Sequence, residues 1–202
     1  MRHFAEKGYQ GTRVEDVAGE LGIAKGSIFQ HFGSKAGLFL AAYKKAVTSF
    51  QAWLDAPSEI VDEGFFSTMT YWLRRTEHLI KEDWVPYRVS LIGNYGTELK
   101  LRREINRFLV SEDPYGTLDF VEFGVGRGEV RGDLDLEMIA SMIDWLVGAL
   151  QDALVTEELD PGLFHRHANQ PERRRVRVEQ FADLIRRAIG AETSAAPPTP
   201  ES

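Results

Sequence analysis

Two short apolar stripes flank a glycine between Thr12 and Lys35, and this pattern constrains the fold more than any other part of the chain. The first stripe has helical spacing and consists of Val14, Val17, Ala18 and Leu21. Gly22 follows where a residue in the left-handed conformation ends a helix. A second helix begins about three residues later, with Ile28 and Phe32 four apart on its buried edge. Helices joined by so short a turn must cross steeply, so the stretch predicts a helix-turn-helix.

The ends of these helices carry recognisable cap residues. Thr12 and Glu15 have the spacing of a capping box, which predicts that the first helix starts at Thr12. Ala24 stands at the cap of the second helix and has no side-chain oxygen, which costs about 1 kcal/mol of helix stability. Ser34 is the expected cap of a third helix, which begins with Lys35.

The segment GYQGTRVEDVAGELGIAKGSIFQHFGSKAGLF closely resembles the DNA-binding region of TetR-type transcriptional regulators and covers about a sixth of the chain. The resemblance rests on the Gly-Tyr turn, the Thr-to-Ala helix, the Leu-Gly-Ile turn, the His-Phe pair and the Ser-Lys pair. It implies an all-α fold in which an N-terminal helix-turn-helix domain is followed by a helical ligand-binding and dimerisation domain. On this basis we expect the DNA-binding domain over residues 1–45, the second domain over 46–190 and a disordered tail over 191–202.

The resemblance also implies how the segment meets DNA. The second helix of the motif enters the major groove, so the base readers are expected to be Lys25, Gly26 and Ser27 near its start. Residues expected to contact the phosphate backbone are Thr12, Arg13, Phe29, His31 and Lys35. For Thr12 a capping role is an open alternative, and Phe29 is open to a role that is half core and half groove wall.

The charge is distributed unevenly along the chain. The net charge is −7, yet residues 1–50 hold seven Lys or Arg against four acids, which leaves −10 on the remaining 152 residues. A small basic module on an acidic body is consistent with DNA contact confined to one end.

The rest of the sequence is predicted to be helical. A long helix follows Ser34 and ends before Pro57, because a proline disfavours helix in the preceding residue. Further helices are expected over 58–82, 84–93, 97–110, 115–127, 135–156 and 171–189. Either Asp133 or Asp135 is the expected cap of the segment 135–156. The resemblance implies that the last two helices pair with their copies in a homodimer, and closure of their own core alone is the alternative.

At the N-terminus, FAEKGY predicts the end of a helix at Gly8, with Phe4 and Tyr9 in contact around it. In the family the first helix is about three turns longer. We therefore expect the true start of the protein to lie upstream of Met1.

Aromatic residues are dense in the middle of the chain, where the family encloses a small-molecule pocket with an apolar lining. The expected lining residues are Trp72, Tyr87, Tyr95, Phe123, Met142 and Trp145. Ordinary core packing is the alternative for each of them. A small, largely apolar effector is the partner that such a pocket would take.

Other chemistry finds little support in the sequence. There is no cysteine, which excludes disulfides and cysteine metal sites and is compatible with the cytoplasm, where we expect the protein to act. No catalytic motif, cofactor motif or metal set emerges, and we expect no enzymatic activity, no cofactor and no membrane association. The expected function is that of a homodimeric repressor that binds an inverted-repeat operator and is released by its effector. The alternatives are an all-α ligand-binding dimer with impaired DNA binding, and an all-α enzyme.

Overall fold

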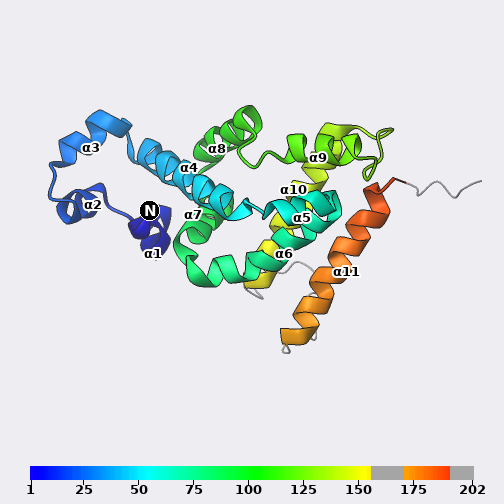
Figure 1. Ribbon diagram of the computed structural model, residues 1–202. Coiled ribbons are helices and arrows are strands. Elements are labelled where there is room, and N and C mark those ends of the chain that lie inside the picture. The colour runs from blue at the N-terminus through cyan, green and yellow to red at the C-terminus, as the bar shows by residue number, and fades with distance from the viewer. Residues whose placement is uncertain (156–170, 192–202) are drawn as a thin grey trace, which may run out of the picture. The chain divides into compact units, whose positions relative to one another are not determined.

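The computed structural model describes residues 1–155 and 171–191, and the expected tail therefore lies almost wholly outside the described residues. The described part is helical, as predicted, apart from one isolated bridge between Val130 and Gly190. The helices in chain order are α1 (Arg2–Gly11), α2 (Val14–Glu20), α3 (Lys25–Phe32), α4 (Lys35–Leu54), α5 (Ser58–Glu63), α6 (Phe65–Glu82), α7 (Trp84–Tyr95), α8 (Leu99–Glu112), α9 (Thr117–Gly126), α10 (Leu136–Val155) and α11 (Pro171–Ile189) (Figure 1).

The chain forms two compact units. Unit 1 contains residues 1–55 and 76–116, and unit 2 contains 56–75 and 117–202, so the division falls within α6. This division by packing differs from the functional boundary expected at residue 45, which stays a prediction. The motif of α2 and α3 therefore belongs to a larger body that also includes α7 and α8.

In unit 1 the long helix α4 is the centre of the core. Phe39, Tyr43, Ala46 and Val47 of α4 are buried together with Val89 and Ile92 of α7, Leu101, Ile105 and Phe108 of α8, and Phe4 and Ala5 of α1. Helix α7 packs against both α1 and α4. Gly93 lets α7 approach α4 closely, because a Cβ there would come within 2.5 Å of the Tyr43 ring, closer than real Cβ atoms pack.

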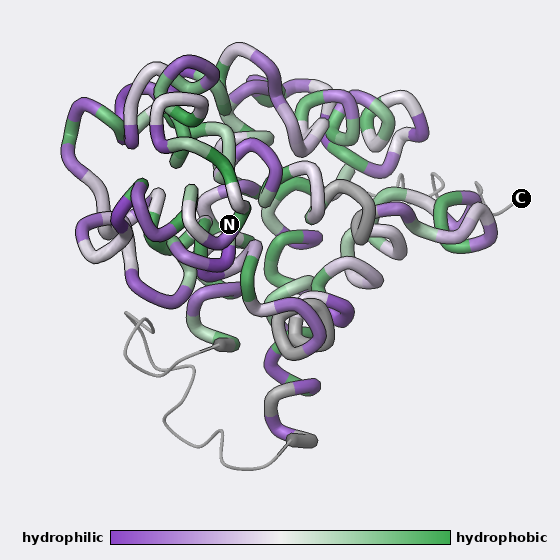
Figure 2. The backbone as a smooth tube through the Cα atoms, turned by 90° about the vertical axis from the view of Figure 1, so that its left-hand side faces the viewer, coloured by the Kyte–Doolittle hydropathy of each residue, from purple (hydrophilic) through white to green (hydrophobic). Residues whose placement is uncertain are grey.

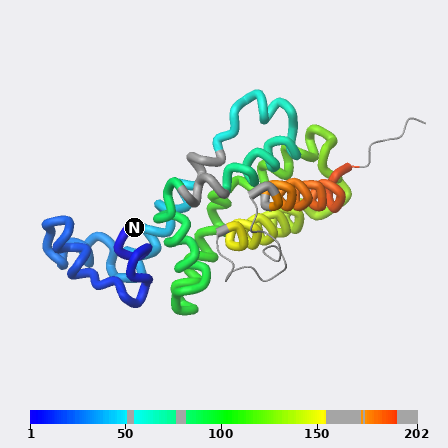
Figure 3. Tube along the Cα trace, turned by 90° about the horizontal axis from the view of Figure 1, so that it is seen from below, coloured from blue at the N-terminus to red at the C-terminus, as the bar shows by residue number. Residues whose placement is uncertain are grey.

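In unit 2 the core lies between α6, α9, α10 and α11. Its largest buried members include Phe65, Met69, Leu73, Ile139 and Ile185. Helices α10 and α11 lie side by side, as the yellow and orange tubes show (Figure 3). Hydrophobic and hydrophilic residues alternate along the helices of both units, as expected for helices with one buried face (Figure 2).

Several local predictions are confirmed. Gly8 has φ +72° and the rings of Phe4 and Tyr9 stack at 6.3 Å, although α1 continues to Gly11 beyond this kink. Helix α4 ends at Leu54, before Pro57. Asp135, and not Asp133, caps α10 by accepting from the Met138 amide at 2.8 Å.

The helix predicted over 58–82 is wrong as one continuous element. It breaks at Gly64, which has φ +120° and separates α5 from α6. A side chain at Gly64 would collide with the Glu129 carboxylate, so the break places a bare backbone against the segment that follows α9. This packing partner is distant in sequence and leaves no local signal.

Candidate nucleic-acid interface

The turn between α2 and α3 forms as the sequence predicts. Gly22 has φ +65°, its N–H donates to the Gly19 carbonyl at 3.2 Å, and the Ile23 N–H donates to the Ala18 carbonyl at 3.0 Å. These two bonds close the C-terminus of α2 in a Schellman motif. A Cβ at Gly22 would meet nothing within 4 Å, so the glycine is required by backbone conformation alone.

A small core fixes α3 against α2. Val14, Ala18 and Ile28 are each at most 5% exposed, and Val17, Phe32 and Leu38 pack around them. Ala18 and Ile28 are thus buried, as their places in the two apolar stripes predict. Because this core lies on one side of α3, the other side of the helix is free to face a partner.

The start of α2 differs from the predicted capping box. Arg13 stands at the cap position, and no side chain caps the helix. The Thr12 hydroxyl instead donates towards two carbonyls of α1, His3 O at 3.0 Å and Gly8 O at 2.8 Å. Thr12 is 1% exposed, so its side chain is directed into the protein and not towards a phosphate, which speaks against its place in the expected DNA-contacting set. A threonine hydroxyl near a helix end has several backbone partners within reach, and here the end of α1 outcompetes the start of α2.

The three expected base readers are exposed at the N-terminal end of α3. Lys25, Gly26 and Ser27 all lie on the surface, and a Cβ at Gly26 would meet nothing within 4 Å. Internal packing therefore gives no reason for a glycine at position 26. Helix α3 starts after Ala24 without a side-chain cap, as its sequence predicts.

Lys25 has an intramolecular partner that sequence reasoning missed. Its Nζ donates to Glu15 Oε1 of α2 at 2.5 Å and lies 5.4 Å from the centre of the Phe29 ring. This hydrogen bond is the main reason that the pKa of the Glu15 carboxyl is lowered from its usual value. Glu15 and Lys25 are ten residues apart on different helices, so only the crossing of α2 and α3 brings them together.

Four of the five expected phosphate contacts lie at least partly on the surface. Arg13 and His31 are exposed, and Phe29 is 37% exposed. The Ser34 hydroxyl accepts from the Gly37 amide at 3.0 Å, which confirms it as the cap of α4. Lys35 at the first position of α4 donates to the Gln10 carbonyl at 3.1 Å, and its Nζ lies 4.9 Å from the centre of the Tyr9 ring.

The six expected ligand-binding residues fall into both units. Tyr87 is buried in unit 1, whereas Trp72, Phe123 and Met142 are half-buried in unit 2. The Trp72 ring lies 4.4 Å from the Phe120 ring, an aromatic contact that favours core packing for this residue. Trp145 is 67% exposed and Tyr95 is 64% exposed.

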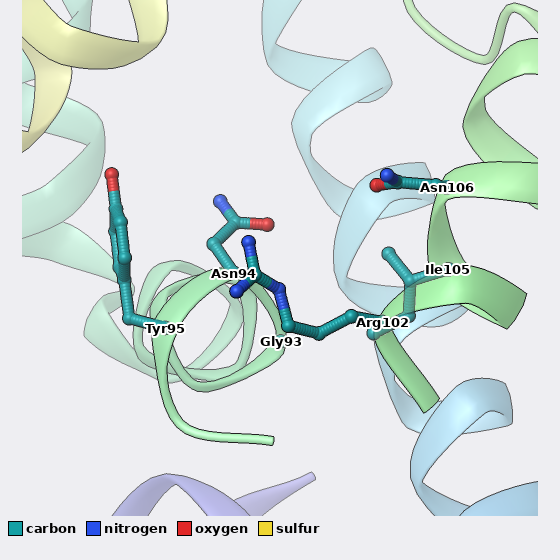
Figure 4. Close-up of a pocket in the computed structure, with 6 residues that line it drawn as sticks. All are labelled: Gly93, Asn94, Tyr95, Arg102, Ile105 and Asn106. Carbon is teal, nitrogen blue, oxygen red and sulfur yellow. The ribbon is translucent and has the colours of Figure 1, made fainter. Parts of the chain in front are cut away.

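A pocket of about 210 Å³ lies between the end of α7 and the middle of α8 in unit 1 (Figure 4). It is lined by Gly93, Asn94, Tyr95, Arg102, Ile105 and Asn106. Tyr95 is the one expected ligand-binding residue in this lining. The sequence signal for the others is weak and consists of two polar residues, Arg102 and Asn106, four apart on α8.

The N-terminal part of the chain, which contains the motif, matches a known protein family. The family described as "Bacterial regulatory proteins, tetR family" matches residues 1–42, which contain the whole of α1, α2 and α3. The transcriptional repressor AcnR of Corynebacterium glutamicum is 26% identical over 164 residues, which are 80% of this chain and 81% of AcnR. Residues 1–42 thus carry the DNA-binding domain of the TetR family.

Two further regulators are similar to this chain over most of its length. The transcriptional repressor KstR2 of Mycolicibacterium smegmatis is 26% identical over 148 residues, which are 69% of this chain and 68% of KstR2. The regulator FadR of Bacillus subtilis, solved in complex with stearoyl-CoA, has the same fold with a TM-score of 0.62 at 18% identity over 91% of this chain and 92% of FadR. These relatives are transcriptional regulators, and this chain shares their all-α fold with an N-terminal helix-turn-helix. Within the described residues of the chain, no helix has the length and apolar character needed to cross a membrane.

Proposed function

We propose that this protein is a homodimeric repressor that binds an inverted-repeat operator in the cytoplasm and is released from it by a small effector. The observation that carries the proposal is the exposed N-terminal end of α3, where Lys25, Gly26 and Ser27 stand on a buried core of Val14, Ala18 and Ile28. A helix held in place by a buried core, with exposed polar groups at its start, is what major-groove reading requires. The repressor sense follows the names of the relatives.

In this proposal Lys25 reads a base and Arg13, His31 and Lys35 hold phosphates. A lysine ammonium donates to guanine O6 or N7, and Ser27 donates to or accepts from several bases. The Glu15 carboxylate holds Lys25 near the surface of α2 before DNA is bound. Lys25 therefore exchanges one carboxylate partner for a base edge when the complex forms.

Dimerisation is supported by exposed apolar stripes on α10 and α11. On α10, Met138, Trp145 and Ala149 are exposed at helical spacing, while Ile139, Ile143 and Leu150 face the core of unit 2. On α11, Leu184 and Ala188 are exposed while Ala182 and Ile185 are buried. Each helix thus has one apolar side for its own core and a second one for a partner, and we assign Trp145 to this dimer surface.

The effector is proposed to be small and largely apolar, and to contact Trp72, Phe123 and Met142 in unit 2. Two recognition helices in a dimer reach successive major grooves about 34 Å apart, so DNA affinity depends on their separation. An effector that prefers another separation releases the DNA to the extent that it binds the two states with different affinity.

The test is binding of the full chain to the DNA upstream of its own gene, measured at several salt concentrations beside a scrambled duplex of equal length. We expect much tighter binding to the natural duplex, a steep loss of affinity with salt and protection of a site with two-fold symmetry. Equal affinity for both duplexes would contradict the regulator proposal and leave a ligand-binding dimer as the alternative.

A further inference from the structure

The pocket between α7 and α8 is lined mainly by groups that donate hydrogen bonds. Asn94 and Tyr95 come from the last turn of α7, and Arg102 and Asn106 come from successive turns of α8 (Figure 4). Ile105 and Gly93 supply the apolar part of the lining. Arg102 extends from α8 to the end of α7, where its guanidinium is seen beside Asn94 in this view.

Two of the polar groups are available to a ligand. Within residues 1–155 and 171–191, the side chains of Arg102 and Asn106 have no hydrogen-bond or ion-pair partner. Asn94 uses its amide oxygen to accept from the Tyr43 hydroxyl at 3.4 Å, which leaves its amide hydrogens free to donate to another group. The available groups therefore include a permanent cation and amide N–H donors.

The carboxylates nearest in sequence are directed elsewhere. The Glu98 carboxylate accepts a hydrogen bond from the Gln10 side chain of α1 at 3.5 Å. The pKa of Tyr9, also in α1, is raised mainly by burial and further by the negative charges of Glu98 and Glu104. Both carboxylates thus interact with residues of α1. Arg102 has no neutralising carboxylate within ion-pair distance in the described part of the chain.

We infer that the pocket between α7 and α8 binds a small molecule that carries an anionic oxygen group, with Arg102 as the main anchor and Asn94 and Asn106 as amide donors. The planar guanidinium presents two parallel N–H groups to a carboxylate or a phosphate. A volume of about 210 Å³ holds about seven groups of the size of a water molecule, which suits a four-carbon dicarboxylate or an inorganic phosphate. This site is separate from the aromatic residues proposed for the apolar effector.

The position of the pocket connects it to the recognition motif within one compact unit. Asn94 accepts a hydrogen bond from Tyr43 of α4, and the neighbouring Gly93 packs closely against the ring of the same tyrosine. Helix α7 also packs against α1, and α4 begins directly after the recognition helix. A ligand that shifts Asn94 therefore also shifts the helices that pack against the motif. This effect on DNA rests on the proposed function, whereas the anion site itself does not.

The test is calorimetric titration of the full chain with three probes: succinate, inorganic phosphate and the neutral succinamide. The variants are Arg102→Ala, Arg102→Lys and, as a control of equal charge change, Arg103→Ala, because Arg103 is an exposed neighbour outside the pocket lining. We expect succinate or phosphate to bind and succinamide to bind at least tenfold more weakly. Arg102→Ala should weaken anion binding about tenfold or more, Arg102→Lys should weaken it less, and Arg103→Ala should change it less than twofold.

The outcomes separate the alternatives. Binding of phosphate but not succinate supports the site and assigns it to phosphate groups, and the reverse assigns it to carboxylates. No binding of either anion at millimolar concentrations, or equal losses in Arg102→Ala and Arg103→Ala, would overturn the inference.

A second measurement adds the bound anion to the complex with operator DNA at constant ionic strength. We expect a fall in DNA affinity of about fivefold or more, which is lost in Arg102→Ala. If the anion binds but DNA affinity stays constant, the coupling to the motif is refuted while the site stands. If the chain binds the anion but no DNA, the proposed function fails and the site is unaffected.

Discussion

The pKa of Tyr43 on α4 depends on how closely unit 1 is packed around this side chain. It is 2% exposed, and burial raises the pKa of its phenol to about 12 from an ordinary value of 10.0. Below pH 10 the phenol is neutral in the folded and the unfolded chain. Between pH 10 and pH 12 the unfolded chain loses this proton first, so the folded state loses stability across that window.

We therefore predict a specific alkaline loss of stability that depends on Tyr43. On going from about pH 9 to about pH 11, the wild-type chain should lose roughly 1 kcal/mol more of its free energy of unfolding than Tyr43→Phe. Urea denaturation at both pH values measures the difference. Equal losses in the two proteins would mean that Tyr43 ionises as easily in the folded chain as in the unfolded one.

Substitutions of Lys25 and Lys35 distinguish a residue that reads bases from one that contacts phosphates. Lys25→Ala should change which bases the operator tolerates, because its ammonium lies at the exposed start of α3. Lys35→Ala should weaken binding to every sequence and lower the salt slope by about one unit. Affinities for a panel of single-base operator variants decide the matter. A uniform loss across the panel in both proteins would remove Lys25 from the base readers.

At the scale of elements, the turn between α2 and α3 isolates the contribution of backbone conformation. Gly22 and Gly19 lie three residues apart, and a Cβ at either position would meet nothing within 4 Å. Gly22 has a positive φ, whereas Gly19 lies within the helical turn before it. The two positions therefore differ in conformation and not in available space.

We predict opposite effects of alanine at these two positions. Gly22→Ala should lower the free energy of unfolding by about 1–2 kcal/mol, because L residues are strained in the left-handed region. Gly19→Ala should raise it by about 0.5–1 kcal/mol, because alanine favours the helix. Thermal and urea unfolding followed by circular dichroism measure both. A stabilising Gly22→Ala would show that α2 ends differently in solution.

In the proposed dimer, a second copy of the chain covers one of the exposed apolar surfaces of the molecule. Leu184 on α11 is 66% exposed and belongs to the proposed dimer surface, whereas Val110 on α8 is 86% exposed and lies outside it. Burying a charge in a dimer interface is costly unless it is paired. The same substitution at the two sites therefore separates interface from free surface.

We predict that Leu184→Glu weakens the dimer at least tenfold and reduces operator affinity, while Val110→Glu changes neither. Light scattering coupled to gel filtration over a range of concentrations gives the dimer constants, and circular dichroism checks that both variants fold. If the Val110→Glu variant were monomeric and the Leu184→Glu variant still dimeric, the interface would lie on α8 and not on α11.

Features that depend on neighbouring residues could be predicted from the amino-acid sequence. The helix-turn-helix, the left-handed glycines at Gly8 and Gly22, and the Ser34 cap all follow from residues within one or two turns of one another. The all-α class was predictable for the same reason, since helical periodicity is a local property.

Contacts between residues that are distant in the chain could not be predicted in this way, because they depend on the tertiary structure. It directed the Thr12 hydroxyl to carbonyls of α1, paired Lys25 with Glu15, and broke the helix at Gly64 where Glu129 approaches. It also brought Asn94 and Arg102 together in one pocket. In each case several partners satisfied the local chemistry equally well, and the packing of one helix against another selected which of them came within reach.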